Sequence, residues 1–290
     1  MVYSVALIPN DSAATKLSSF LGSYTICLSS LSDIVINGVH GIIVDVDLDL
    51  QPELIIWLRE GNLKTFALDW YVDDGSAIKE KINLRDSISA LKYCIIREEF
   101  HKASEKYAGS PPQNDVVVVI GGGDLRGYLP LILKYFTEED FFLNKKIVIV
   151  LGPMVNDSEL SLSKEQNNIS FLKNPGNIAE IMASTHIGIS NGGTSLMEFT
   201  MLGVPTIIFP QSEREETFIS PFLERRCGIL GSIERHEFIK QFNQLWEDIT
   251  LRKSMSETGR KLIDGLGAIR IAEAIESFSR RIMNNESFGY

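Results

Sequence analysis

Basic side chains are in short supply in this sequence. Its 290 residues include 28 Lys and Arg against 38 Asp and Glu, which gives a formal net charge of -10. A surface with excess negative charge repels a phosphate backbone unless one face is strongly basic, and the basic runs here are short pairs such as Lys145-Lys146 and Arg225-Arg226. We therefore expect no nucleic-acid partner.

Cysteines and long apolar runs are also few. Cys27, Cys94 and Cys227 are odd in number and widely spaced, which excludes a disulfide framework and a CxxC metal site. No stretch reaches the roughly 18 uninterrupted apolar residues of a membrane span, and no basic segment precedes the first apolar run. The sequence predicts a cytoplasmic protein without a membrane span or a metal site.

The dinucleotide fingerprint GxGxxG is missing as well. The triple glycine at 121–123 lacks that spacing, and no acidic residue closes a following strand about 20 residues later. This argues against an NAD-dependent dehydrogenase.

What the chain does have is an alternation of buried strands and helices. Apolar runs bounded by turn residues recur with helical segments between them, the pattern of a parallel sheet covered on both faces. Rising polarity after Phe100 and the pair Pro111-Pro112 indicate a linker. We predict an α/β protein of two Rossmann-like domains, 1–108 and 114–290. Strands are expected at 2–8, 25–28, 41–46, 65–69, 93–96, 116–120, 147–151, 187–190 and 206–209, and helices at 13–21, 52–60, 129–136, 178–184 and 195–202.

The most informative stretch is ISNGGTSLMEFTMLGVPTIIFPQ at 189–211. Gly192 and Gly193 allow a tight turn, and a helix beginning at Thr194 or Ser195 presents unpaired N–H groups and the positive end of its dipole, which suit a diphosphate. Glu198, one turn into the helix, could accept hydrogen bonds from two ribose hydroxyls. The alternative is a well-capped helix that binds nothing.

This stretch resembles the phosphate- and ribose-binding signature in the C-terminal domain of the GT-B superfamily. Within it, the likeness is to the UDP-sugar hydrolase family of pseudaminic acid biosynthesis and to the lipid II synthase-type glycosyltransferase family. VVVVIGGGDLRGYLPLILKYF, IVIVLGPM, NPGNIAEIMASTHIGIS and DGLGAIRIAEAI resemble further family segments in the same order. The resemblance implies a GT-B architecture with the active cleft between the domains. It also implies a nucleotide-sugar site made by Gly121, Gly122, Asp124, Gly152, Gly192, Gly193, Thr194, Ser195, Glu198 and Gln211.

The catalytic residues are less defined. GIIVDVDLDL and KTFALDWYVDDG resemble the hydrolase and place Asp45 and Asp69 at the ends of parallel strands. Family members follow their first strand with a glycine-rich loop that contains a histidine, whereas this chain reads ALIPNDSAATKL and offers Asp11 as a substitute base.

The segment after the signature also departs from the family. Gln211 is retained, but SEREE follows it. Arg214 is a candidate contact to a phosphate or an acidic sugar, and Glu213, Glu215 and Glu216 are expected in the solvated first turn of a helix.

These observations predict a hydrolase of a nucleotide sugar, with a UDP-sugar as ligand, or an inverting glycosyltransferase of surface-carbohydrate biosynthesis. It would need no metal or cofactor and act as a monomer or homodimer. The alternative is a catalytically inactive nucleotide-sugar-binding partner or regulator, which the missing N-terminal loop suggests.

Overall fold

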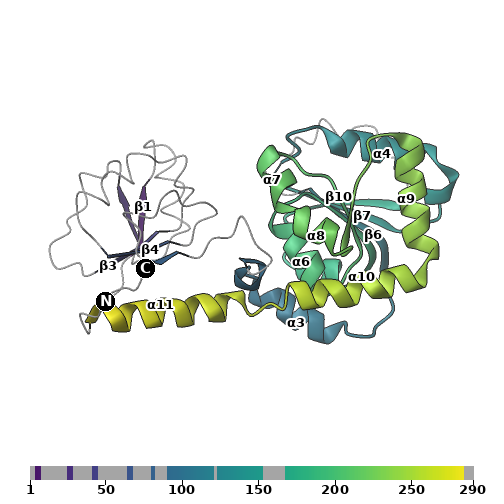
Figure 1. The fold of residues 1–290 in the computed structure, drawn as a ribbon. Coiled ribbons are helices and arrows are strands. Elements are labelled where there is room, and N and C mark those ends of the chain that lie inside the picture. Colours follow the sequence, from purple (N-terminus) through teal and green to yellow (C-terminus); the bar gives the residue numbers. More distant parts are fainter. Residues whose placement is uncertain are drawn as a thin grey trace. The chain divides into compact units, whose positions relative to one another are not determined.

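The computed structural model describes residues 4–7, 25–28, 41–44, 64–67, 80–81, 90–120, 123–152 and 167–283 (Figure 1). The chain divides into two compact units, Met1–Leu84 with Glu273–Tyr290 and Arg85–Ala272. The two units are described separately.

The first unit contains two sets of parallel strands. β1 (Ser4–Leu7) pairs with β2 (Thr25–Leu28), and β3 (Gly41–Val44), β4 (Lys64–Ala67) and β5 (Glu80–Lys81) form a three-stranded sheet. The first four strands fall on predicted strands. The predicted helices at 13–21 and 52–60 lie outside the described residues.

The second unit is built on a parallel six-stranded sheet with the order β11-β10-β9-β6-β7-β8. The chain builds outward from β6 to β8 and then returns to place β9 on the other side of β6, so the strand order switches between β6 and β9. Its strands are β6 (Asn114–Val119), β7 (Ile147–Leu151), β8 (Ile169–Lys173), β9 (Thr185–Ser190), β10 (Thr206–Ile208) and β11 (Gly228–Leu230).

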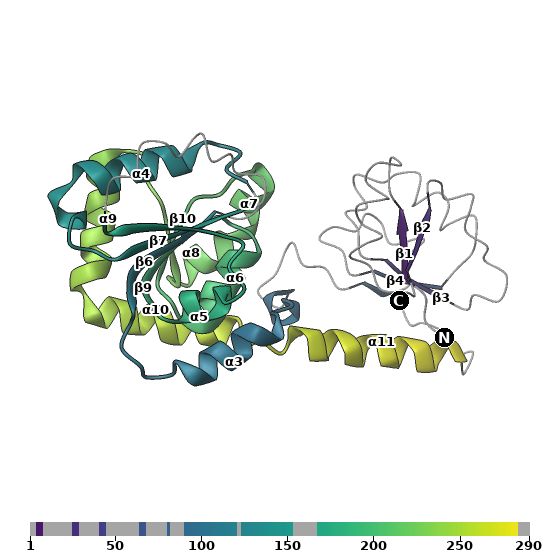
Figure 2. The same ribbon diagram turned by 180° about the vertical axis from the view of Figure 1, so that it is seen from behind.

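Helices cover both faces of this sheet, with α4 on one face and α5 and α6 on the other (Figures 1 and 2). The central strands are therefore buried on both sides, and Val116, Ile149 and Ile189 are fully inaccessible. The helical elements are η3 (Ala90–Tyr93), α3 (Glu98–Lys106), α4 (Tyr128–Glu138), η4 (Asp140–Phe142), α5 (Ile178–Ala183), α6 (Thr194–Leu202), α7 (Glu213–Phe218), α8 (Ser220–Glu224), α9 (Arg235–Glu247), α10 (Ile249–Leu262) and α11 (Gly267–Met283).

The predicted domain boundary between residues 108 and 114 differs from this division. Helix α3 occupies part of the predicted linker and packs beside α5 and α6, with Phe100 and Ala103 buried. The pair Pro111-Pro112 then leads directly into β6, where the N–H groups of Gln113 and Asn114 donate to the carbonyl of Ser184. The predicted strand at 93–96 is also wrong, because η3 and an irregular segment occupy that region.

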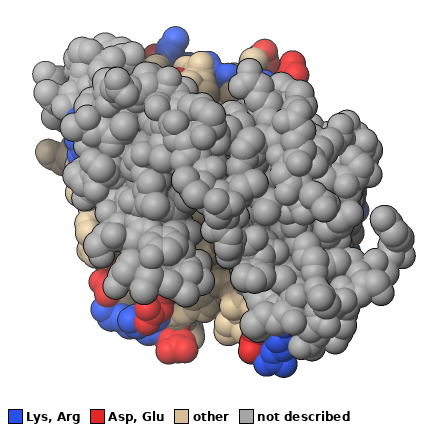
Figure 3. All heavy atoms as spheres, turned by 90° about the vertical axis from the view of Figure 1, so that its left-hand side faces the viewer, with Lys and Arg blue, Asp and Glu red and all other residues tan. Residues whose placement is uncertain are grey.

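Charges on the described surface are mixed in sign. Where described residues show on the face in Figure 3, Lys and Arg lie beside Asp and Glu. Among the described helices none is long and apolar enough to cross a membrane. The same part of the chain holds no cluster of three or more His, Cys, Asp or Glu side chains arranged to bind a metal ion.

Candidate functional site

A pocket of about 630 Å³ lies at the carboxyl ends of the central strands of the second unit. Val119 ends β6, Leu151 ends β7 and Asn191 follows β9, so the pocket sits at the place where the strand order switches. Ligands of open parallel sheets bind at such switch points, and this volume suits a small organic ligand.

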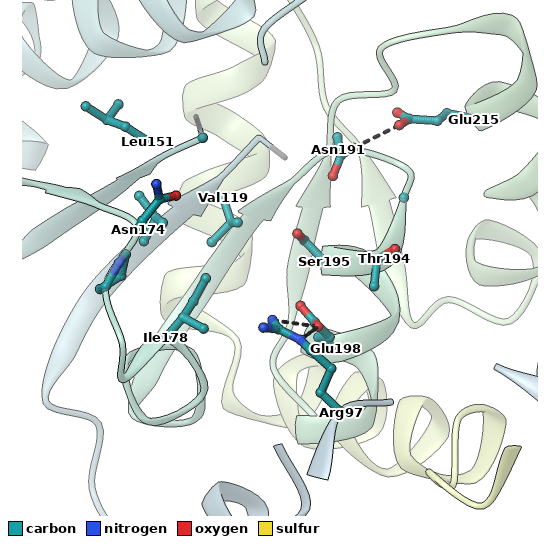
Figure 4. A pocket seen from close by; sticks show the side chains of 14 residues that line it. Arg97, Val119, Leu151, Asn174, Ile178, Asn191, Thr194, Ser195, Glu198 and Glu215 are labelled. Carbon is teal, nitrogen blue, oxygen red and sulfur yellow. Dashed lines mark hydrogen bonds and ion pairs between the residues drawn. The ribbon is translucent and has the colours of Figure 1, made fainter. Parts of the chain in front are cut away.

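Helix α6 points its N-terminus at this pocket (Figure 4). Gly193, Thr194 and Ser195 line it, and the first N–H groups of a helix have no acceptor within the helix. At Gly192 a Cβ atom would lie 2.8 Å from both Glu215 Cβ and Ile219 Cγ2, so the turn requires glycine there. The predicted glycine-opened helix is present in the structure.

Glu198 lies one turn into α6 and its side chain is only 3% exposed. Its Oε1 accepts a hydrogen bond from Arg97 Nε at 3.0 Å and forms an ion pair with Arg97 Nη2 at 2.9 Å. Burial raises the pKa of Glu198 above its ordinary value, and the Arg97 guanidinium partly opposes that shift. Arg97 lines the pocket with a half-exposed side chain, and sequence reasoning missed it because 101 residues separate the pair.

The segment that carries Arg97 is held by DGLG at 264–267, the start of the stretch DGLGAIRIAEAI that resembles a family segment. Asp264 pairs with Arg270 through two hydrogen bonds of 2.8 and 2.6 Å, and Arg270 also donates to the carbonyl of Lys92 at 2.8 Å. A Cβ atom at Gly267 would overlap the carbonyl oxygen of Cys94. We call this set of contacts the Asp264 clasp. In this structure the motif positions the Arg97 segment and does not line the pocket.

Glu215 lies on the other side of the α6 N-terminus. Its Oε1 accepts from Asn191 Nδ2 at 2.8 Å, and its Oε2 accepts from the N–H groups of Gly192 at 2.9 Å and Gln211 at 2.7 Å. Glu213, Glu215 and Glu216 lie in the first turn of α7 as predicted, but the expectation that Glu215 is solvated is wrong, because it is half-buried with its carboxylate fully bonded. The local signal was Ser212-x-x-Glu215: Ser212 Oγ caps the N–H of Glu215, as in a capping box, and the carboxylate turns back toward the preceding residues.

The other predicted site residues have different surroundings. The carboxylate of Asp124 accepts from the N–H groups of Tyr128 and Leu129 at 2.9 and 2.6 Å, so it caps α4. Gln211 Oε1 accepts from the N–H of Arg126. Asp124, Gln211 and Gly192 are not among the described lining residues, and the exposed Arg214 is not either.

The described pocket thus brings together part of the predicted site. Five predicted residues line it, namely Gly152, Gly193, Thr194, Ser195 and Glu198. Five others lie outside the described residues, namely Asp11, Asp45, Asp69, Gly121 and Gly122.

Part of the second unit is similar to a known domain family. Residues 116–217 match the Glycosyltransferase family 28 C-terminal domain. The chain is 24% identical over 251 residues to the spore coat polysaccharide biosynthesis protein SpsG of Bacillus subtilis (strain 168). That alignment covers 84% of this chain and 65% of SpsG, so the chain spans less than two thirds of its relative.

Solved structures of other proteins share the fold. The glycotransferase of kitacinnamycin superposes with a TM-score of 0.65 at 12% identity, covering 93% of this chain and 90% of that one. The S. aureus MnaA-UDP co-structure gives a TM-score of 0.60 at 11% identity, covering 99% of this chain and 91% of that one. These likenesses show that the chain has the GT-B fold. The family match runs from β6 into α7, so it includes Gly192, Gly193, α6 and Glu215 but not Arg97.

Proposed function

We propose that this pocket binds a nucleotide sugar, with a UDP-sugar as the ligand, and that the protein is a glycosyltransferase-type enzyme of carbohydrate biosynthesis. The observation that carries the proposal is the N-terminus of α6 open to the pocket, with the buried carboxylate of Glu198 one turn farther along. The family match over residues 116–217 and the likeness to SpsG support it.

The ligand's diphosphate is placed at the start of α6. The N–H groups of Gly193, Thr194 and Ser195 and the helix dipole favour a negative charge there. Arg97 lines the same pocket, but its guanidinium already pairs with Glu198 and Glu99, so the start of the helix supplies the neutralising groups. The scheme therefore requires neither a metal nor an organic cofactor.

Glu198 is assigned to the ribose. Both of its described contacts with Arg97 use Oε1, which leaves Oε2 for a ribose hydroxyl. Arg97 also keeps the carboxylate in a fixed orientation, so the acceptor is positioned before the ligand arrives.

The proposed reaction is attack of an acceptor hydroxyl, or of water in a hydrolase, on the anomeric carbon as the nucleoside diphosphate leaves. Negative charge then develops on the leaving phosphate, where the α6 N–H groups are already oriented to stabilise it. Asp11, Asp45 and Asp69 remain the predicted candidates for the base that removes the nucleophile's proton.

Catalytic inactivity is the second candidate. It is favoured by one sequence observation, the lack of glycine and histidine in ALIPNDSAATKL. An enzyme should lose most of its rate when the true base among the three aspartates becomes asparagine, whereas an inactive binder has no rate to lose.

Titration calorimetry and thermal unfolding with UDP, CMP, GDP, UDP-N-acetylglucosamine and NAD test the binding proposal. We expect UDP or its sugar to bind, and ligand at a hundred times its dissociation constant to add about 2.7 kcal/mol to the unfolding free energy. Glu198→Ala should weaken binding by about tenfold or more, because a buried acceptor for the ribose is lost. Glu180→Ala, on α5 and outside the described lining, is the matched control. Failure of every nucleotide to bind would contradict the proposal.

A further inference from the structure

The two ends of the described pocket differ in the groups they present. In Figure 4, Arg97 and Glu198 lie at one end, Asn191 and Glu215 lie at the other, and Thr194 and Ser195 lie between them. We call these the Glu198 end and the Glu215 end. If the diphosphate sits at the α6 N-terminus and the ribose on Glu198, as proposed above, the sugar occupies the Glu215 end.

No cation balances the charge of Glu215 among its described contacts. Its three donors are two backbone N–H groups and the Asn191 amide, all of them neutral. The described salt bridges of the neighbouring region pair Arg126 with Glu216 and leave Glu215 out. Among the described residues, the negative charge of Glu215 is therefore not paired with a cation.

One buried hydrogen-bond acceptor at this end also lacks a donor among the described residues. Asn191 uses its Nδ2 on Glu215, and its Oδ1 is buried with no described partner. An unpaired buried acceptor costs free energy that a ligand hydroxyl would recover. Asn191 and Glu215 both line the pocket, so both acceptors border the space the sugar would fill.

We infer that the Glu215 end selects the sugar by charge: it accepts hydrogen bonds from the hydroxyl or ammonium groups of a neutral or amino sugar and rejects an acidic sugar. A carboxylate on the sugar would face Glu215 without a cation between them, and it could not donate to Asn191 Oδ1. Two carboxylates that share one partly buried site repel each other strongly enough to lower the affinity of the ligand by about tenfold or more. Arg214, predicted as a contact for an acidic sugar, is exposed and outside the described lining.

The test compares UDP-N-acetylglucosamine with UDP-glucuronate by titration calorimetry, with UDP as the reference ligand. In the wild-type chain, we expect the acidic sugar to bind at least about tenfold more weakly than the neutral one. In Glu215→Gln that ratio should shrink by about tenfold, because the repelling charge is gone. The ratio of the two affinities is informative even when both affinities fall, because a disturbed turn at Gly192 and Gly193 would weaken the binding of both ligands.

Two further variants control for local damage. Glu215→Asp keeps the charge and should keep the wild-type ratio within about twofold, even if its shorter side chain disturbs the turn. Glu216→Gln removes an exposed charge that pairs with Arg126 and should also leave the ratio unchanged.

The inference is overturned if the wild type binds the acidic sugar as well as the neutral one, or if Glu215→Gln leaves the ratio unaltered while UDP still binds. If neither UDP nor any UDP-sugar binds the wild type, the proposed function itself fails, and this inference fails with it.

Discussion

The two ends of the pocket hold a carboxylate in two different ways. Glu198 is almost completely buried, and one cation, Arg97, makes both of its described polar contacts, a hydrogen bond and an ion pair. Glu215 is half-buried and takes its three hydrogen bonds from neutral N–H groups. An ion pair offsets the negative charge of Glu198 and holds its carboxylate in position as a hydrogen-bond acceptor. The negative charge of Glu215 has no described cation beside it, so it acts on any ligand bound there. A carboxylate can thus bind the ligand at one end of the pocket and discriminate between sugars by their charge at the other.

The largest expected effect comes from disturbing the Glu215 end through its packing. Gly192→Ala places a Cβ atom 2.8 Å from Glu215 Cβ and Ile219 Cγ2, so α7 or the glycine turn must shift. We expect a loss of about 1–3 kcal/mol in unfolding free energy and a loss of UDP affinity of more than about tenfold. Urea denaturation and calorimetry measure both.

Gly176→Ala is the matched control for this substitution. Gly176 lies near the pocket residues Asn174 and Pro175, but an added Cβ atom would meet nothing within 4 Å beyond its chain neighbours, and its φ is not positive. It should be close to neutral in both measurements. A Gly192→Ala protein as stable as the wild type would show that the close packing of Gly192 against Glu215 and Ile219 does not hold the Glu215 end in place.

Removing Arg97 tests whether the ion pair is what distinguishes Glu198 from Glu215. Arg97→Ala takes away the group that opposes the upward pKa shift of Glu198, so the pKa should rise further. A carboxyl with a folded pKa above its unfolded one loses stability as pH rises through the folded value. The variant should therefore unfold almost like the wild type in acid. At neutral pH it should lose about 1 kcal/mol, a figure kept small because Arg97 is 52% exposed.

Urea denaturation from about pH 4 to pH 8 measures this dependence on both sides of the ordinary carboxyl pKa. The double variant Arg97→Ala with Glu198→Gln lacks the Glu198 carboxyl but keeps Glu99, the other partner of Arg97, as the single variant does. The extra pH dependence that comes from Glu198 should disappear in it. The same loss at every pH would mean that Arg97 acts through packing on Phe100, over whose ring it lies, rather than through Glu198.

The smallest effect is expected at the Asp264 clasp. Its pairing with Arg270 lowers the pKa of Asp264, so the pair stabilises the fold above the ordinary aspartate pKa and loses that contribution as pH falls. Asp264→Asn should cost about 0.5 kcal/mol at neutral pH, since the carboxylate is partly exposed, and less as the pH approaches about 3.

Ligand affinity completes this prediction. Because the clasp positions the segment that carries Arg97, Asp264→Asn should also weaken UDP binding by severalfold, measured by calorimetry at neutral pH. An unchanged UDP affinity would show that the Asp264 clasp does not influence ligand binding at the Glu198 end.

The parts of the fold that sequence predicted are those with strong local patterns. The stretch at 189–211 combines a buried strand, two glycines, an apolar helix and a glycine stop, and the structure has β9, α6 and β10 there. Helix α3 was missed because its polar sequence buries only Phe100 and Ala103, and the nearby proline pair dominated the pattern.

Site residues that depend on distant contacts were not predictable in the same way. The capping-box spacing of Ser212 and Glu215 indicates a helix start, but not that the carboxylate reaches a glycine turn 23 residues earlier in the chain. The partner of Glu198 comes from a segment 101 residues away. The roles of Asp11, Asp45 and Asp69 stay predictions.

A crystal structure of the protein with UDP tests the central claim most directly. The account predicts the diphosphate within hydrogen-bonding distance, about 3 Å, of the N–H groups of Thr194 and Ser195, with a ribose hydroxyl on Glu198 Oε2. A diphosphate bound elsewhere on the chain, with the start of α6 left empty, would contradict it.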